Sequence, residues 1–194
     1  MQKVFTQLLI VTLALLNVAN CFYGWGKCPD VEVAASLDPA LYAGRWYEMY
    51  RGPLFQQDGQ ECVTADYTLQ TDRSLRIRNY GTVPGETNEG IRGRATCQGA
   101  RCRVKFDPFY IPYGPYLVLS VDYSSYALVY TCTHYLFGLF RLENVWILSR
   151  GTTLTGITSN DILTILNTKV PNYPTSELTA TTQGGSCTYI TPGQ

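Results

Sequence analysis

The chain lacks the sequence patterns of known catalytic and metal sites. It has a single histidine, His134, and no Cys-x-x-Cys pair, Gly-x-Ser-x-Gly elbow, His-Glu-x-x-His helix or glycine-rich phosphate loop. Structural zinc sites combine several cysteine and histidine ligands, and a nucleophile needs a base beside it. We therefore expect no catalytic residue and no metal site, and we expect His134 to be a loop or surface residue. An enzyme is the least favoured hypothesis, and a free thiol in the mature protein would support it.

Neither sign of charge is in excess, since 15 Lys and Arg residues balance 15 Asp and Glu residues. Nucleic acids and anionic membranes attract proteins through a surplus of cations. The interspersed charges predict no nucleic-acid partner and no electrostatic field for an anionic membrane. Asn-x-Ser and Asn-x-Thr sequences are also absent, so N-glycosylation is not expected.

Only one markedly apolar run is present, at residues 8–16. It is too short to cross a bilayer and stands where the apolar part of a secretory signal peptide belongs. Small residues predict cleavage after Cys21, with Ala19 at the −3 position, and a cut one or two residues earlier is the alternative. We expect residues 1–21 to be a signal peptide, residues 22–194 to form a single domain, and the product to be secreted and extracellular.

Cleavage after Cys21 leaves six cysteines. An even number in an oxidising compartment predicts three disulfides, but six cysteines allow 15 pairings and their spacing does not choose among them. A metal site is the competing interpretation, and the shortage of histidine argues against it. The six are Cys28, Cys62, Cys97, Cys102, Cys132 and Cys187.

Much of the chain alternates apolar and polar residues in short runs bounded by Gly, Pro, Asn and Asp, which is typical of β-strands. The connections are mostly short, which favours antiparallel neighbours. Eight such strands remove their exposed edges by closing into an up-and-down barrel with room for one small ligand. A sandwich is the alternative architecture. The expected strands are residues 44–51, 61–70, 74–82, 89–98, 101–107, 115–123, 126–133 and 144–150.

A helical period appears only after the eighth strand. Thr158 or Ser159 is the expected N-cap of this helix, whose apolar residues run from Ile162 to Val170, and Pro171 follows directly. The predicted fold class is therefore all-β: an eight-stranded antiparallel up-and-down barrel with one C-terminal α-helix packed outside.

Strand order predicts which end of the barrel is open, because every second connection of an up-and-down barrel lies at the same end. The odd connections are long and the even ones are tight. Trp46, Asp122-Tyr123 and Arg150 fall at the tight end, which we expect to be a closed floor. The mouth is expected at the long loops, residues 52–60, 83–88, 108–114 and 134–143.

Three short motifs at this floor stand far apart in the sequence: Gly44-Arg45-Trp46, Asp122-Tyr123 and Arg150. They resemble the G-x-W block, the T-D-Y block and the arginine after the eighth strand in the lipocalin family. Val121 departs from the pattern, since it replaces the threonine of the second block. The resemblance implies that Arg150 stacks on Trp46 in a cation–π contact that seals the barrel. The residues with a structural role at the floor are then Gly44, Trp46, Asp122, Tyr123 and Arg150.

Longer segments resemble the branch of this family that contains apolipoprotein D, insect bilin-binding proteins and crustacyanins. They are Gly26-Lys27-Cys28-Pro29, residues 126–132, residues 145–150 and Gly185-Ser186-Cys187. By analogy with these proteins, Cys28 pairs with Cys132 and Cys62 pairs with Cys187. Cys97 and Cys102 then remain for each other across a tight connection.

The resemblance implies a secreted carrier that binds a small hydrophobic molecule in the barrel without chemical change. Fatty acids, steroids, retinoids, bilins and carotenoids are the candidate cargoes, and no cofactor is expected beyond a bound lipid, bilin or carotenoid. Glu48 is expected to face inward and to make a hydrogen bond at the floor. Alternation and the resemblance together predict the ligand-binding residues Tyr67, Asn79, Ile91, Phe106, Val118, Tyr130 and Trp146.

Two of the mouth loops are unusually apolar, and an exposed apolar patch often marks an interaction surface. They are expected to cover a ligand, to contact a membrane or lipoprotein, or to form a homo-oligomer; folding over the barrel's own core is the structural alternative. The second functional hypothesis is therefore a pigment-associated or oligomerising interaction protein. The residues of this apolar rim are Tyr110, Ile111, Tyr113, Leu136, Phe137, Leu139 and Phe140.

Overall fold

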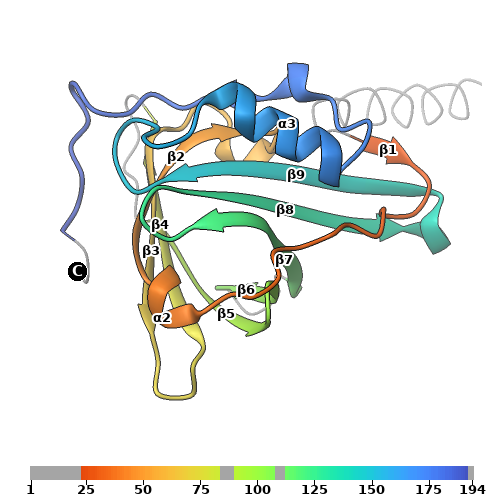
Figure 1. The fold of residues 1–194 in the computed structure, drawn as a ribbon, viewed down its shortest axis with the longest axis horizontal. Coiled ribbons are helices and arrows are strands. Elements are labelled where there is room, and N and C mark those ends of the chain that lie inside the picture. The colour runs from red at the N-terminus through yellow and green to blue at the C-terminus, as the bar shows by residue number, and fades with distance from the viewer. Residues whose placement is uncertain (1–22, 84–89, 108–111, 192–194) are drawn as a thin grey trace, which may run out of the picture.

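Eight antiparallel strands form a closed barrel in the computed structural model, which describes residues 23–83, 90–107 and 112–191 (Figure 1). Consecutive strands pair from β2 to β9, and β9 also pairs with β2, which closes the barrel. The predicted fold class is confirmed. The strands are β2 (Gly44–Arg51), β3 (Glu61–Leu69), β4 (Leu75–Thr82), β5 (Ile91–Gln98), β6 (Arg101–Phe106), β7 (Gly114–Asp122), β8 (Tyr126–Tyr135) and β9 (Phe140–Ser149).

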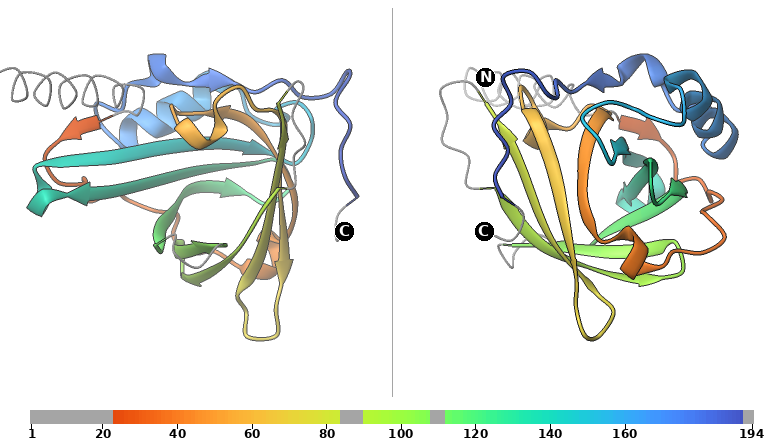
Figure 2. Two further views of the ribbon diagram at one scale, coloured as in Figure 1. Left: turned by 180° about the vertical axis from the view of Figure 1, so that it is seen from behind. Right: turned by 60° about the vertical axis from the view of Figure 1, so that its left-hand side comes forward.

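Side chains alternate between the two faces of the barrel wall and so build two apolar cores. The inner core lies inside the barrel around Trp46, Tyr67 and Leu148. The outer core contains Met49 and Leu128 and lies between the wall and the helix α3 (Ser159–Lys169). The helix therefore covers one side of the barrel, as Figure 2 shows.

The helix α3 begins at a capping box. The Thr158 side chain accepts a hydrogen bond from the Asp161 backbone N–H, and the Asp161 carboxylate accepts one from the Thr158 N–H. Two backbone donors of the first turn are thereby satisfied. Ile162 and Leu166 are fully buried against the barrel, so the structure contains the predicted helix and the first of its two expected caps.

Several short elements escaped the sequence analysis, because none is long enough to show a period. One of them, α2, starts at Asp38, whose carboxylate accepts the N–H of Ala40, and Pro39 occupies its first turn. Both residues are typical of a helix start. The short elements are β1 (Tyr23–Trp25), α2 (Pro39–Tyr42), η1 (Phe55–Gln57), η2 (Leu136–Gly138), η3 (Thr175–Glu177) and β10 (Thr179–Ala180).

The predicted loop at residues 134–143 is wrong. β8 continues to Tyr135 and β9 begins at Phe140, so a long hairpin extends beyond the barrel (Figure 1). Two contacts support the extension: β1 pairs with β9, and the rings of Tyr135 and Phe140 stack with centroids 5.5 Å apart. Only η2 and Leu139 connect the two strands, so the apolar residues of this segment form a hairpin tip, which we define as residues 135–140.

The described part of the chain contains three disulfides: two join the terminal segments to the barrel, and one joins the neighbouring strands β5 and β6. The first two span sequence separations of 104 and 125 residues, and the third spans 5. The first two pairs are those that the family resemblance implied, and the third joins the two cysteines that remained. The pairs are Cys28–Cys132, Cys62–Cys187 and Cys97–Cys102.

Some of the predictions fall outside the described residues. The signal peptide at 1–21 with its cleavage site, and Tyr110 and Ile111 of the predicted rim, lie there. Within the described part of the chain, no helix combines the length and the apolar character needed to cross a membrane.

Candidate ligand-binding site

A cation–π pair closes one end of the barrel. The guanidinium carbon of Arg150 lies 3.7 Å from the centroid of the Trp46 ring, and Trp46 is fully buried. The Trp46 indole N–H donates to the carbonyl of Tyr42 in α2 at 2.9 Å. Burial lowers the pKa of Arg150, but a guanidinium stays charged in proteins. Its N–H groups donate to the backbone carbonyls of Leu41, Ala43, Arg45 and Tyr123.

The other predicted floor residues hold the chain around this pair. Gly44 has a φ of +103°, and a Cβ there would approach the guanidinium to 3.1 Å. The hydroxyl of Tyr123 accepts the N–H of Asp38, just before α2, at 2.9 Å. The Asp122 carboxylate accepts the N–H and the hydroxyl of Ser124 and so shapes the turn between β7 and β8. The floor residues therefore meet at one end of the barrel, where they bind the backbone and each other.

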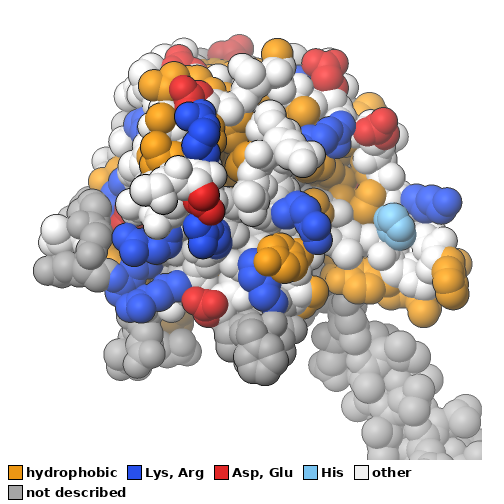
Figure 3. Space-filling view, turned by 90° about the horizontal axis from the view of Figure 1, so that it is seen from below, with side chains coloured by type: hydrophobic (Ala, Val, Ile, Leu, Met, Phe, Trp, Pro, Cys, Tyr) orange, Lys and Arg blue, Asp and Glu red, His pale blue; other side chains and the backbone are white. Residues whose placement is uncertain are grey.

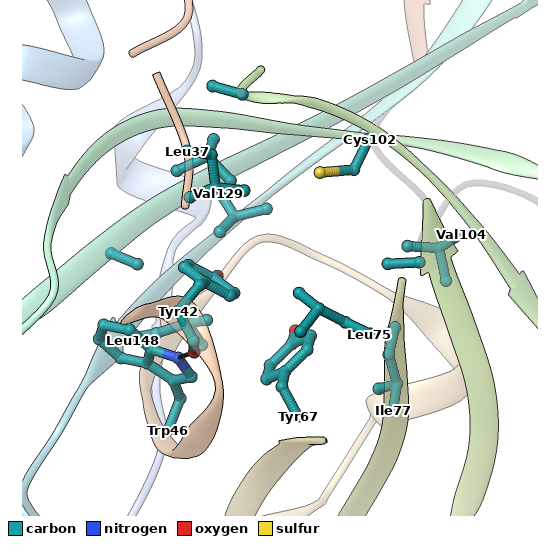
Figure 4. Packing of buried hydrophobic residues seen from close by; sticks show 14 residues of the cluster. Leu37, Tyr42, Trp46, Tyr67, Leu75, Ile77, Cys102, Val104, Val129 and Leu148 are labelled. Carbon is teal, nitrogen blue, oxygen red and sulfur yellow. Dashed lines mark hydrogen bonds between the residues drawn. The ribbon is translucent and has the colours of Figure 1, made fainter. Parts of the chain in front are cut away.

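Three tyrosine hydroxyls meet above the floor, inside the barrel. The hydroxyl of Tyr116 lies 2.6 Å from that of Tyr42 and 2.8 Å from that of Tyr67. The Tyr42 and Tyr67 rings meet edge to face with centroids 5.2 Å apart, and Figure 4 shows both near Trp46. Tyr42 and Tyr67 are buried, whereas Tyr116 is half-buried. Because each hydroxyl can donate and also accept, the cluster retains hydrogen-bonding capacity at the base of the barrel.

The tyrosine cluster should make the fold unstable at alkaline pH. Burial raises the pKa of Tyr67 to about 12, and it raises the pKa of Tyr42 and Tyr116 well above the usual 10.0. Because these pKa values are higher in the folded than in the unfolded chain, their contribution to stability is complete below pH 10 and is lost as the pH rises toward 12. A pKa difference of one unit is worth about 1.4 kcal/mol, so Tyr67 alone accounts for about 3 kcal/mol.

Urea unfolding at about pH 9 and about pH 11 measures about half of this loss, because pH 11 lies midway between the two pKa values of Tyr67. The Tyr67→Phe variant should lose less stability between the two pH values than the wild type. Tyr80→Phe is the matched control, because Tyr80 lies on the outward-facing alternation of β4 and should follow the wild type. Equal losses in the wild type and Tyr67→Phe would contradict the prediction.

Inward-facing side chains are more exposed at the end of the barrel that lies opposite the floor. Tyr67 is 5% exposed, whereas Ile91 at the start of β5 is 38% exposed. Asn79 is half-buried and stands opposite Ala65 and Ile91 in the sheet. Its side-chain oxygen is buried and accepts no hydrogen bond from any residue that the structure describes. A buried acceptor without a donor is unfavourable by about 1–3 kcal/mol.

Six of the seven predicted ligand-binding residues lie on the inward-facing alternation of their strands. Val118 is fully buried in the inner core, and Phe106 and Trp146 pack against that core while half-buried. Tyr130 is the exception, since it is fully buried in the outer core and its hydroxyl donates to Glu143 at 2.6 Å. The prediction for Tyr130 is wrong, because β8 is buried on both faces and its alternation does not distinguish them.

A buried ion pair lies on the inner face beside Trp146. Arg51 donates to Glu48 at 2.8 Å, and their side chains are 7% and 3% exposed. Glu48 also accepts from Gln57 of η1 and from the hydroxyl of Thr181. Gln57 in turn accepts the indole N–H of Trp146 at 2.9 Å. Glu48 therefore faces inward as expected, but its hydrogen bonds join it to the C-terminal segment and, through Gln57 of η1, to Trp146, and not to the floor.

Sequence reasoning missed Arg51 and Gln57. The register of β2 against β9 shifts between Glu48 and Tyr50, and a β-bulge of this kind puts residues three apart on the same face. Strict alternation would place Arg51 outside the barrel. Since Glu48 matches its charge, the wall beside Trp146 presents a neutral pair to the interior.

The hairpin tip carries most of the described part of the predicted apolar rim. Phe137 is 103% exposed and has a positive φ of 57°. Trp25 of β1, which the sequence analysis did not include, is 80% exposed and stands opposite Phe140. Tyr113 lies elsewhere, against cations of β6. The exposed apolar residues of the tip are Tyr135, Leu136, Phe137 and Leu139.

A closed eight-stranded barrel sealed by a tryptophan–arginine pair, with an external C-terminal helix, is the architecture of a lipocalin. The chain belongs to the lipocalin family, since the family model described as a lipocalin-like domain matches residues 37–183. Rabbit (Oryctolagus cuniculus) apolipoprotein D is 38% identical over 149 residues, which cover 74% of this chain and 77% of that protein. Apolipoprotein D of Rattus norvegicus is 35% identical over 170 residues, covering 80% and 88%.

Solved structures show the same fold at lower identity. Insecticyanin from Manduca sexta superposes with a TM-score of 0.72 at 21% identity and covers 84% of this chain and 90% of its own. Lobster apocrustacyanin A1 superposes with a TM-score of 0.66 at 22% identity, covering 83% and 96%. The relatives therefore belong to the branch that the sequence motifs indicated.

Proposed function

We propose that this lipocalin is a secreted carrier that binds one small, uncharged hydrophobic molecule inside the barrel and releases it unchanged. The observation that carries the proposal is the composition of the barrel interior. Apolar and aromatic side chains line it, and a few polar groups are placed at defined depths. This composition is typical of small-molecule sites, in which apolar surface supplies affinity and a few polar atoms fix orientation.

The polar groups of the interior suit a hydroxyl or an N–H better than a carboxylate. The buried oxygen of Asn79 has no donor among the described residues, and the Tyr116 hydroxyl stands below it in the barrel. The guanidinium of Arg51 is already bound to Glu48. A carboxylate entering here would lose hydration without gaining a free cation. Among the candidate cargoes, sterols and retinoid alcohols therefore fit better than fatty acids.

Secretion and the absence of catalysis complete the proposal. The predicted signal peptide and the three disulfides support an extracellular location, because disulfides persist in oxidising compartments. All six cysteines of the described chain are paired, so none supplies the free thiol that an enzyme hypothesis required. Among the described residues, no group of three or more His, Cys, Asp or Glu side chains is arranged to hold a metal ion.

Retinol and retinoic acid, which share a hydrocarbon and differ in the end group, test the proposal. Titration of each into the apoprotein is followed by quenching of tryptophan fluorescence, to which Trp146 in the barrel contributes. We expect retinol to bind at least about tenfold more tightly, since an unpaired buried carboxylate is costly. Retinoic acid binding as tightly as retinol would contradict the preference for uncharged cargo. Failure of both, with no bound mass in native mass spectrometry of the protein from its source, would contradict the carrier function.

Asn79→Ala provides the matched test of the site. Loss of one buried hydrogen bond should weaken retinol binding by about tenfold. Asn160→Ala is the control, because Asn160 is exposed on α3, outside the barrel. If the two variants bind retinol equally well, the cargo does not reach Asn79.

The hairpin tip favours a second function, assembly with another molecule. Phe137 and Trp25 are exposed at 103% and 80%, and large exposed apolar side chains gathered in one place often mark an interaction surface. Contact of the tip with a second copy or with a lipid surface would make the protein an interaction protein. A dimer that persists in analytical ultracentrifugation after the cargo is stripped would support this function, and a monomer that does not bind lipid vesicles would contradict it.

A further inference from the structure

Three consecutive strands of the barrel wall carry many cations and no acidic residue. β4 reads LRIRNYGT, β5 reads IRGRATCQ and β6 reads RCRVKF. Their apolar residues, such as Leu75, Ala95 and Val104, belong to the inner core, so the intervening cations point outward. We call this surface the basic face. Its cations are Arg76, Arg78, Arg92, Arg94, Arg101, Arg103 and Lys105.

Cations on the basic face stand directly opposite one another. In the register of the sheet, Arg76 lies opposite Arg94, and Arg78 lies opposite Arg92. Arg94 also lies opposite Lys105 on its other side. Like charges that face each other across antiparallel strands destabilise a sheet. The arrangement is unfavourable for the isolated protein, and binding of an anion would relieve it.

Carboxylates neutralise only part of the basic face. Asp72 pairs with Arg94 at 2.9 Å and Asp30 pairs with Arg101 at 3.4 Å, and all four side chains are more than half exposed. Exposed pairs of this kind contribute little to stability and exchange readily. No carboxylate in the described ranges lies within salt-bridge distance of the remaining arginines, Arg76, Arg78, Arg92 and Arg103.

An exposed aromatic ring borders the basic face. Tyr113 is 57% exposed, and the cationic groups of Arg103 and Lys105 lie 5.0 Å and 5.6 Å from its ring centroid. The ring combines an apolar face with a polar tip, which suits contact with a sugar ring. Tyr113 was expected at the apolar rim of the mouth, and its cationic neighbours connect it to this surface.

The basic face is not evident from the net charge of the chain, which is zero. The sequence-based expectation of no field for an anionic partner rested on 15 cations and 15 acids spread through the chain. Folding instead gathers seven of those cations on three neighbouring strands. Figure 3 shows Lys and Arg side chains grouped on one part of the surface with few acidic side chains among them. The expectation took no account of which strands carry the cations.

We propose that the basic face binds a linear sulfated polysaccharide and so retains the protein at cell surfaces or in the extracellular matrix. Arginine suits this partner, because its planar guanidinium donates two parallel hydrogen bonds to an oxyanion. Cations on one face recur about 5 Å apart across strands and about 7 Å apart along them, which fits a partner with repeated anionic groups. The proposal rests on secretion, which is part of the proposed function, but not on the identity of the cargo.

A lipid bilayer fits the basic face less well. Apart from the cations, alternation leaves only Tyr80, Thr82, Thr96 and Gln98 facing outward on these strands, so no large aliphatic side chain is available for insertion. The wall is also curved, and a flat bilayer would touch only a narrow strip of it. A flexible polymer can follow the cations around the barrel. The exposed apolar residues of the protein lie instead on the hairpin tip.

Binding of the full mature protein to immobilised heparin, measured over a range of NaCl concentrations, tests the proposal. The triple variant Arg76→Gln, Arg92→Gln, Arg103→Gln removes three cations that have no carboxylate partner among the described residues. At about 150 mM NaCl we expect it to lose at least about tenfold in affinity, and we expect the slope of log K against log salt to fall by roughly three. The control, Lys27→Gln, Arg73→Gln, Lys169→Gln, removes the same charge elsewhere and should stay within about twofold of the wild type.

Two outcomes would overturn the proposal. Equal losses in the two triple variants would mean that heparin senses only net charge. Tighter binding of the wild type to vesicles that contain phosphatidylserine than to heparin, abolished by the basic-face variant, would identify an anionic bilayer as the partner. Retinol titration of both variants keeps the two proposals separate, because neither set of substitutions touches the inner face of the barrel.

Discussion

Replacing Arg150 with methionine should lower the free energy of unfolding by about 3–5 kcal/mol, because several hydrogen bonds and a cation–π contact are lost together. Methionine keeps an apolar side chain of similar length against Trp46 but donates no hydrogen bond. The carbonyls of Leu41, Ala43, Arg45 and Tyr123 then lose their donor at a partly buried position.

Urea unfolding followed by circular dichroism measures this loss. Arg73→Met is the matched control: Arg73 pairs with Asp38, but the two side chains are 68% and 45% exposed, and such a pair contributes at most about 1 kcal/mol. Arg150→Lys should fall between the wild type and Arg150→Met, since an ammonium retains the charge and loses the planar fork. A loss in Arg150→Met no larger than that in Arg73→Met would show that the floor does not depend on this guanidinium.

The floor could be predicted from sequence because its residues are fixed by short motifs and by strand parity. Trp46 and Arg150 come from opposite ends of the strand series, yet an up-and-down order brings the start of the first strand and the end of the eighth together. The closed barrel supplies that order. The contact of 3.7 Å between the pair is then a consequence of topology together with one aromatic and one cationic residue.

Side-chain direction could be predicted only where one face of a strand meets solvent. In β5 and β6 the buried residues alternate with exposed ones, and the inward positions follow directly. In β8, residues from Ala127 to Tyr130 are all fully buried, because the inner core covers one face and α3 covers the other. Alternation carries no information there, and Tyr130 was assigned to the wrong face.

The polar part of the site could not be predicted from the sequence, because the pairing of β2 with β9 is irregular there. The register shift in β2 turns Arg51 inward beside Glu48, and nothing in the local sequence marks a bulge. Gln57 reaches Trp146 from a single turn of 3₁₀-helix, which has no period to recognise. The basic face was hidden for a different reason, since composition counts charges without regard to the strand that carries them.

Removing the Cys62–Cys187 disulfide should lower the free energy of unfolding by about 5 kcal/mol, and removing Cys97–Cys102 by only about 2 kcal/mol, according to the chain-entropy model of disulfides. The difference arises because the first closes a sequence separation of 125 residues and the second closes one of 5. Burial would predict the opposite order, since Cys102 is 3% exposed in the inner core while Cys187 lies in the half-buried C-terminal segment.

The two double variants, Cys62→Ala with Cys187→Ala and Cys97→Ala with Cys102→Ala, separate these effects in urea unfolding experiments. Removing the Cys62–Cys187 disulfide should also affect the ligand-binding site. The C-terminal segment carries Thr181, which donates to the buried Glu48 at 2.7 Å. A detached segment would leave that carboxylate with one donor fewer, and retinol binding should weaken more in the first double variant than in the second. Equal losses of stability in the two double variants would mean that native packing, and not the entropy of the unfolded chain, sets the value of each disulfide.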